Sequence, residues 1–134
     1  MTATGAVAYV DSSALVKLVI PEPESGALRG GLAAWGRHVS SALARVEVAR
    51  ACARLNATAR ATAERVVGAL DLIALDDDVL LEAARLAPVE LRSLDAIHVA
   101  SALVLGEAVG VAFAYDERLI QAMAAAGIAT ASPR

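Results

Sequence analysis

Four acidic residues stand out because of the apolar segments in which they lie. Asp11 ends the apolar run AYV and is followed by two serines, and Asp116 ends a second run, AFAY. Asp95 falls in the first turn of an apolar helical segment, and Glu47 lies at the edge of the apolar face of ALARVEVARA. A bare carboxylate in such surroundings is costly. Four converging carboxylates would suit one or two Mg²⁺ or Mn²⁺ ions, which prefer oxygen ligands.

Each acid also has an ordinary structural explanation. Asp11 or Asp116 can cap the helix that follows it, and Asp95 can complement the helix dipole from a first turn. Glu47 can pair with Arg50 on a helix surface, which stabilises little. Residue types alone therefore favour the structural explanation of each acid over a metal site.

Two further residues could carry chemistry of other kinds. His98 lies three residues after Asp95, and a single histidine on an apolar helix is more typical of a hydrogen-bonded packing residue than of a base or metal ligand. Cys52 is the only cysteine, which excludes an intramolecular disulfide and a thiolate zinc site. The motifs GxxxxGK[ST], GxGxxG, HExxH and GxSxG are absent.

The segments that must position these residues alternate between strand-like and helical patterns. Strands are predicted at residues 7–10, 38–40, 72–75, 111–115 and 128–130. Helices are predicted at residues 14–20, 25–35, 42–55, 57–71, 76–88, 94–105 and 117–126. This alternation favours an α/β fold with a parallel sheet covered by helices on both faces. In such a sheet ligands bind beyond the carboxyl ends of the strands, where Asp11 and Asp116 fall.

Several helix starts are marked by short polar residues. Ser12 or Ser13, Ser41 and Ser93 each precede a helical pattern, and the acidic triplet 76–78 opens another. Such residues accept hydrogen bonds from the free N–H groups of a first turn. We therefore predict helix caps at these places.

The composition indicates one domain over residues 1–134 and limits its partners. Of the 134 residues, 57% are hydrophobic, 3% are aromatic, and the net charge is −3. A strongly basic groove and an aromatic stacking surface are thereby excluded, so a nucleic-acid partner would have to be bound by other means. No uncharged run reaches the roughly 18 residues of a spanning helix, and no basic residue precedes Asp11 to mark a secretory signal. We expect a cytoplasmic protein without a membrane partner.

Four segments of the chain resemble a known family over nearly its whole length. They are AYVDSSALVKLVIPEPES, ALARVEVARA, LRSLDAIHVASAL and AFAYDERLIQAMAAAGI, in that order. Together they resemble the PIN-domain ribonucleases, in particular the VapC toxins of bacterial toxin–antitoxin pairs. The resemblance implies a PIN-like three-layer α/β/α sandwich with a central parallel sheet of about five strands.

The resemblance assigns roles to the four acids. Asp11, Glu47, Asp95 and Asp116 match the catalytic, metal-binding acids of the family, with Asp11 and Asp95 as the first direct ligands. The implied cofactor is Mg²⁺ or Mn²⁺. Such an ion lowers the pKa of a bound water and stabilises charge on a phosphodiester, so no protein nucleophile is required.

Three smaller residues complete or qualify this match. Ser13 matches a hydroxyl that supports the first acid, and Ser93 matches a small polar position before the third, where a helix cap explains it equally well. Ala114 departs from the family, because many relatives have Thr or Ser two residues before the fourth acid. That departure bears on the role of Asp116.

The resemblance also implies partners and leaves alternatives open. It implies an RNA substrate such as tRNA or rRNA, a homodimer, and a small VapB-like antitoxin whose C-terminal segment enters the acidic cleft and forms a hetero-oligomer with the toxin. A haloacid-dehalogenase type of enzyme would need a second Asp where Ser13 stands. A non-catalytic PIN-like module for dimerisation or partner binding is the stronger alternative, because Ala114 is atypical and the net charge does not favour RNA.

Overall fold

The computed structural model describes residues 6–134. Its elements are β1 (Val7–Val10), α1 (Ser12–Val19), α2 (Ser25–Ala33), β2 (Arg37–Ser41), α3 (Ala44–Ala53), α4 (Ala57–Gly68), β3 (Asp71–Ile73), α5 (Asp77–Arg85), α6 (Ser93–Val104), the 3₁₀ helix η1 (Gly106–Ala108), β4 (Val109–Phe113), α7 (Glu117–Ala125) and β5 (Thr130–Ala131). Residues 1–5 lie outside the described residues. They are part of the predicted domain 1–134 and of the segment searched for a secretory signal.

The five strands form one parallel sheet in the order β3-β2-β1-β4-β5. The predicted α/β class and the five-stranded parallel sheet are therefore confirmed. The first strand of the chain occupies the middle, with Tyr9 aligned to Val39 of β2 on one side and to Ala112 of β4 on the other. The carboxyl ends of β1 and β4 consequently lie next to each other at one edge of the sheet.

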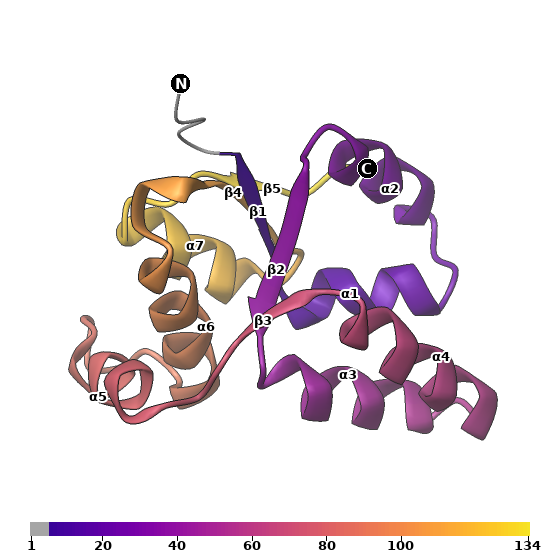
Figure 1. Cartoon of the computed structure of the whole chain (residues 1–134), viewed down its shortest axis with the longest axis horizontal. Helices are drawn as coiled ribbons and strands as arrows, with labels where there is room; N and C mark the ends of the chain where they lie inside the picture. The colour runs from indigo at the N-terminus through magenta and orange to yellow at the C-terminus, as the bar shows by residue number, and fades with distance from the viewer. Residues whose placement is uncertain (1–5) are drawn as a thin grey trace.

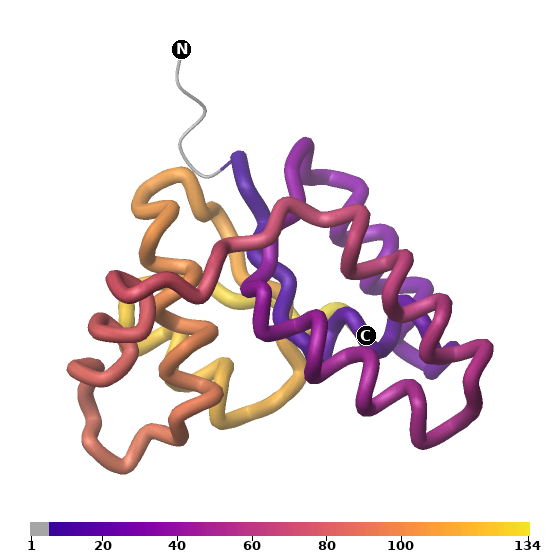
Figure 2. Tube along the Cα trace, turned by 60° about the horizontal axis from the view of Figure 1, so that its bottom comes forward, coloured from indigo at the N-terminus to yellow at the C-terminus, as the bar shows by residue number. Residues whose placement is uncertain are grey.

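Helices cover both faces of this sheet and make the three-layer sandwich (Figure 1). Ala8 and Val10 of β1 face the core beneath α1–α4, whereas Val7 and Tyr9 face the core beneath α6 and α7. All four residues of β1 are buried, as expected for the central strand of a sheet covered on both faces. The second view shows the same division, with the α5–α7 layer and the α1–α4 layer on opposite sides of the sheet (Figure 2).

The helix caps differ in part from the predicted ones. Asp11, rather than Ser12 or Ser13, caps α1, because its carboxylate accepts the Ala14 N–H at 2.9 Å. The two serines lie inside the first turn, where their hydroxyls are free to reach other groups. This is the structural role that the sequence offered for Asp11.

Ser41 and Ser93 do not cap helices. Ser41 is the last residue of β2, and its hydroxyl accepts the Leu43 N–H in the turn before α3. Ser93 is the first residue of α6 rather than its cap. The acidic triplet behaves as predicted, since the Asp76 carboxylate accepts the Val79 N–H at the start of α5.

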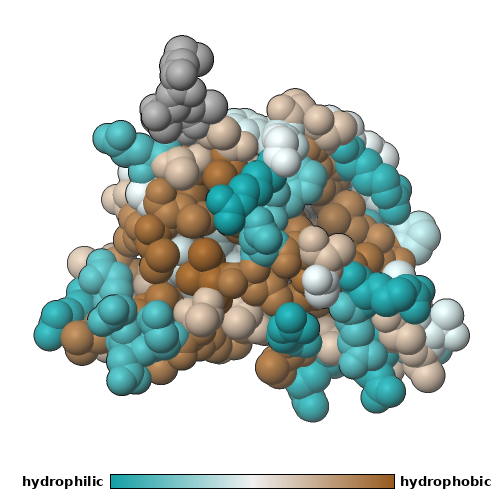
Figure 3. All heavy atoms as spheres, viewed as in Figure 1, coloured by the Kyte–Doolittle hydropathy of each residue, from teal (hydrophilic) through white to brown (hydrophobic). Residues whose placement is uncertain are grey.

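The surface carries polar and apolar regions side by side. On the face shown in Figure 3, apolar side chains run across the middle, between polar side chains at the outer ends of the two helical layers. Within residues 6–134, no helix combines the length and the apolar character needed to cross a bilayer.

Candidate active site

Asp11 directly follows the central strand β1 and is almost completely buried. Its side chain is 2% exposed and accepts hydrogen bonds from the Ala14 N–H at 2.9 Å and from the Ser13 hydroxyl at 2.8 Å. The Ser13 hydroxyl in turn accepts the Tyr115 N–H at 2.9 Å, and the Asp11 N–H donates to the Phe113 carbonyl. Asp11 and Ser13 thereby tie the end of β1 to the end of β4.

The environment of Asp11 opposes its ionisation. Burial raises the pKa of the carboxyl to about 6, although the hydrogen bonds from Ala14 and Ser13 and the charge of His98 act to lower it. Within residues 6–134, no Lys or Arg lies within ion-pair distance of Asp11. The result is a fixed, dehydrated carboxylate without a cation, which is a costly arrangement unless a ligand compensates it.

Glu47 is held by a chain of polar side chains that joins α1, α3, α6 and β1. Its Oε1 accepts the Ser12 hydroxyl at 2.6 Å and contacts His98 Nε2 at 2.7 Å. On its other nitrogen, Nδ1, His98 contacts the Tyr9 hydroxyl at 2.7 Å. Because a carboxylate only accepts hydrogen bonds, Nε2 carries the hydrogen in the contact with Glu47.

This chain stabilises the charge of Glu47. Burial alone would raise the pKa of the Glu47 carboxyl, but the hydrogen bonds from His98 and Ser12 and the charge of His98 bring it below its ordinary value. The Arg50 pairing offered by the sequence is absent from the ion pairs of residues 6–134, where Glu47 pairs with His98. Glu47 is therefore an ionised, oriented carboxylate rather than a surface partner of Arg50.

Asp95 and Asp116 lie near the starts of two neighbouring helices, α6 and α7. Asp95 is partly buried in the first turn of α6, and its pKa is raised first by burial and then by the negative charge of Asp116. His98, Arg92 and Arg118 act in the opposite direction. Asp116 caps α7 by accepting the Arg118 N–H at 3.0 Å and remains exposed.

We refer to Asp11, Glu47, Asp95 and Asp116 as the acid site. His98 is the common neighbour of three of them, because its charge acts on Asp11, Glu47 and Asp95. Across residues 6–134, no three His, Cys, Asp or Glu side chains are close enough together to enclose a metal ion. The acid site is thus an open arrangement of neighbouring carboxylates and not a closed cage.

The donors in the acid site are of the kind that Mg²⁺ and Mn²⁺ take. Carboxylate oxygens are hard ligands, and two of the four carboxyl groups, Asp11 and Asp95, have raised pKa values that a divalent cation would lower. Mg²⁺ usually keeps several waters and binds through one or two carboxylates together with substrate phosphates. An open arrangement therefore fits such an ion in chemistry, with space left for water and substrate.

The predicted supporting residues have different positions. Ser13 contacts Asp11, as described above. Ser93 is exposed and lines a shallow groove with Leu80 of α5 and Ile97 of α6, away from Asp11. Ala114 is fully buried: its side chain belongs to the core beneath α6 and α7, and its carbonyl accepts the Ser132 hydroxyl.

His98, Tyr9 and Ser12 are members of the site that the sequence did not assign. His98 is buried and hydrogen-bonded, as expected of a packing residue, but its partners are Glu47 and Tyr9. A signal was present in the sequence, because a histidine on a buried helix and a tyrosine in a buried strand both need hydrogen-bond partners. Which partners they find depends on packing between distant segments.

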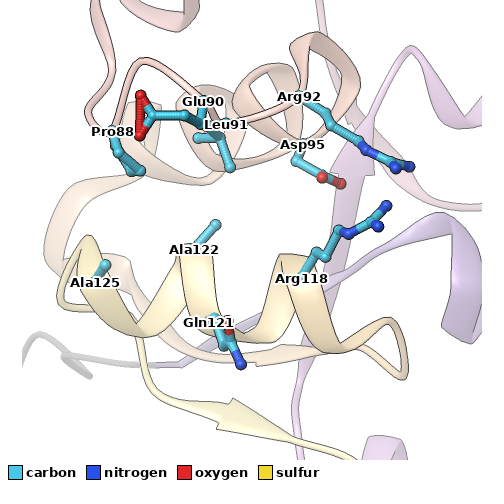
Figure 4. A pocket seen from close by; sticks show the side chains of 9 residues that line it. All are labelled: Pro88, Glu90, Leu91, Arg92, Asp95, Arg118, Gln121, Ala122 and Ala125. Carbon is cyan, nitrogen blue, oxygen red and sulfur yellow. The ribbon is translucent and has the colours of Figure 1, made fainter.

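A groove of about 510 Å³ opens beside Asp95, between the loop before α6 and helix α7. Figure 4 shows Arg92 from the loop side and Arg118 from α7 extending in the same direction, with the Asp95 carboxylate between them. Leu91 and Ala122 face each other further along the groove. We call this hollow the Asp95 groove.

Comparison with known proteins matches this chain to one family. The PIN domain family model matches residues 8–125. The chain is 47% identical to Ribonuclease VapC46 of Mycobacterium tuberculosis, over 96% of this chain and 98% of that protein. It is 38% identical to Ribonuclease VapC47 of M. tuberculosis, over 93% and 96% of the two chains. It is 36% identical to Ribonuclease VapC35 of the same species, over the same shares.

Proposed function

The chain belongs to the PIN-domain family and is a VapC-type ribonuclease toxin, and from this premise we propose that the acid site cleaves RNA with the help of Mg²⁺ or Mn²⁺. The observation that carries the proposal is the Asp11 carboxylate, which is buried at the end of the central strand, fixed by hydrogen bonds and without a cationic partner among the described residues. A divalent cation would relieve the cost of that charge.

In this proposal Asp11 and Asp95 bind the ion directly, and Glu47 and Asp116 bind it directly or through water. When bound, the ion supplies a Lewis acid that lowers the pKa of water and offsets charge on a phosphodiester. The chain supplies orientation: Ser13 and the Ala14 N–H fix the Asp11 carboxylate. His98 and Ser12 keep Glu47 ionised and turned toward the site.

We further propose that the substrate is a structured RNA such as tRNA or rRNA, and that the toxin acts in the cytoplasm as a homodimer restrained by a VapB-type antitoxin. Partner surfaces are available on the outer layer, because Leu80 and Leu81 of α5 and Leu94 of α6 are 43%, 49% and 50% exposed. Leucines exposed on neighbouring helices are typical of protein contacts rather than of a solvated face.

The proposal is tested with purified, antitoxin-free protein incubated with total RNA in Mg²⁺, Mn²⁺ or EDTA, followed by sequencing of the fragment ends. We expect fragments with defined ends that require the metal. Asp95→Asn should abolish them, whereas Glu64→Gln, a matched change at an exposed acid of α4, should leave them unchanged.

A second readout separates metal binding from cleavage. Mn²⁺ should raise the thermal midpoint of the wild-type protein, because a ligand that binds only the folded state stabilises it. Asp11→Asn should remove most of this increase. A folded protein that neither gains stability from Mn²⁺ nor cleaves RNA would instead be a non-catalytic PIN module, and the proposal would be wrong.

A further inference from the structure

The Asp95 groove carries positive charge from two arginine side chains. Arg92 and Arg118 line it from opposite sides and flank Asp95 (Figure 4). Neither guanidinium makes an ion pair with an acid of residues 6–134. Two exposed cations thus meet at the end of the groove nearest the acid site.

Paired guanidinium groups at such a position match a phosphate. The planar fork of arginine binds phosphate oxygens in a bidentate manner, and arginine is the residue most used for this purpose. In a chain of net charge −3, a polyanion gains no attraction from the overall charge. The two arginines beside the acid site, which make no ion pair, can therefore attract the phosphates of an RNA strand to it.

Beyond the arginines the groove becomes mainly apolar. Leu91 and Ala122 face each other across it, and Pro88 lies further out (Figure 4). Two polar groups also line this part, the Gln121 amide on the α7 side and the Glu90 carboxylate on the loop side. The volume of about 510 Å³ lies within the range of pockets that hold small molecules. A flat apolar group with polar edges, such as a nucleobase, suits this lining better than a second charged group does.

We propose that the Asp95 groove is a subsite for the nucleotide next to the cleaved bond, with its phosphate between Arg92 and Arg118 and its base against Leu91 and Ala122. The inference rests on the proposed ribonuclease function and adds to it a recognition role for residues outside the acid site. The groove admits a base that is unstacked from its neighbours, which places the cleaved bond in a single-stranded loop or end of the RNA.

The charge contribution is tested with Arg92→Gln, Arg118→Gln and the double variant, against Arg60→Gln at an exposed arginine of α4. We expect each groove variant to raise KM for the cleaved RNA about tenfold, as for the removal of a charged hydrogen bond, with a smaller change in kcat. Binding of a short fluorescein-labelled single-stranded RNA in EDTA, followed by anisotropy, should weaken in parallel. The slope of its salt dependence should decrease by about 0.7 in each single variant, because one phosphate fewer is neutralised.

The base contribution is tested with Ala122→Leu, which narrows the groove, against Ala124→Leu on the same helix, outside the groove. Replacing the nucleotide beside the cleaved bond by an abasic residue should weaken cleavage by the wild-type protein and by Ala124→Leu. It should have little further effect on Ala122→Leu, because the base has already been excluded. Circular dichroism and thermal midpoints establish that both variants are folded.

The two proposals fail in different ways. Absence of cleavage by the wild-type protein with every metal would refute the ribonuclease function and the subsite with it. If Arg92→Gln and Arg118→Gln cleave and bind RNA as well as Arg60→Gln does, the subsite alone is overturned. The groove would then belong to a ligand other than RNA.

Discussion

Replacing Asp11 by asparagine should make the metal-free protein more stable while it removes metal binding. Asparagine keeps the shape of the side chain and can still accept the Ala14 N–H at the start of α1. It no longer places a charge at a position where only 2% of the residue is exposed. The site therefore stores an unfavourable charge that the substitution releases.

The magnitude follows from the pKa of Asp11. Burial raises this pKa from an ordinary 3.8 to about 6. Since one pKa unit corresponds to about 1.4 kcal/mol, the rise corresponds to about 3 kcal/mol of free energy. The amide accepts the hydrogen bond from the Ser13 hydroxyl less well than the carboxylate does, which reduces this gain in stability by about 1 kcal/mol. We expect Asp11→Asn to raise the free energy of unfolding by about 2 kcal/mol near pH 7.

The pH dependence gives the sign of the effect. The folded protein holds the Asp11 proton more tightly than the unfolded chain, so this carboxyl contributes its full stability below about pH 4 and loses it as the pH rises through 6. The advantage of the variant should therefore grow between these two values and then level off. Asp95, whose pKa is also raised, contributes in the same direction in both proteins.

The assay is urea unfolding in EDTA at a series of pH values, followed by the fluorescence of the single tryptophan, Trp35, which packs against the core beneath α1–α4. Glu64→Gln serves as the control for removal of an exposed charge. Adding Mn²⁺ should reverse the order, since the wild-type protein gains about 2.7 kcal/mol at a concentration a hundred times Kd and the variant gains little. A variant that is less stable than wild type near neutral pH, or a difference that does not change with pH, would refute the reasoning.

Three further substitutions probe the surroundings of the site and the backbone. Tyr9→Phe should lower the free energy of unfolding by about 1–3 kcal/mol in urea titrations, because His98 Nδ1 loses its buried partner; unchanged stability would show that the contact contributes nothing. Ser13→Ala should cost a similar amount and raise the pKa of the Asp11 carboxyl further, measured by NMR titration, since the substitution removes a hydrogen-bond donor to it. Gly127→Ala should cost about 1–2 kcal/mol because φ is +85° at this residue, whereas Gly68→Ala at the end of α4 should not destabilise; equal effects would contradict this explanation.

The sequence was sufficient for the layered architecture, because short strand-like runs alternate with helical patterns along the chain. The run before Asp11 predicts β1 without error at either end. Helix starts were harder to predict. Ser41 has the chemistry of a cap, but pairing with β3 extends β2 through this residue, and the helix begins three residues later. Such boundaries are decided by the neighbouring strand and not by local preference.

The acid site was predictable only in part. The positions of Asp11 and Asp116 after parallel strands follow from topology, since carboxyl ends meet at one edge. The connection of Tyr9 through His98 to Glu47 joins residues separated by 89 and 51 positions in the chain. No spacing rule within a segment shows such a connection, because it arises from the docking of α6 against the face of β1.

The central position of β1 also sets the order in which the enzyme can become active during synthesis. Residues 7–10 leave the ribosome well before residues 109–113, so one edge of β1 stays without its partner strand until β4 has followed. Ser13, which binds the Asp11 carboxylate, also accepts a hydrogen bond from the Tyr115 N–H. This second hydrogen bond can form only after Tyr115 has been added to the chain. A growing chain therefore cannot complete the acid site until Tyr115 and Asp116 have been translated, so a shortened chain that ends before Tyr115 lacks it.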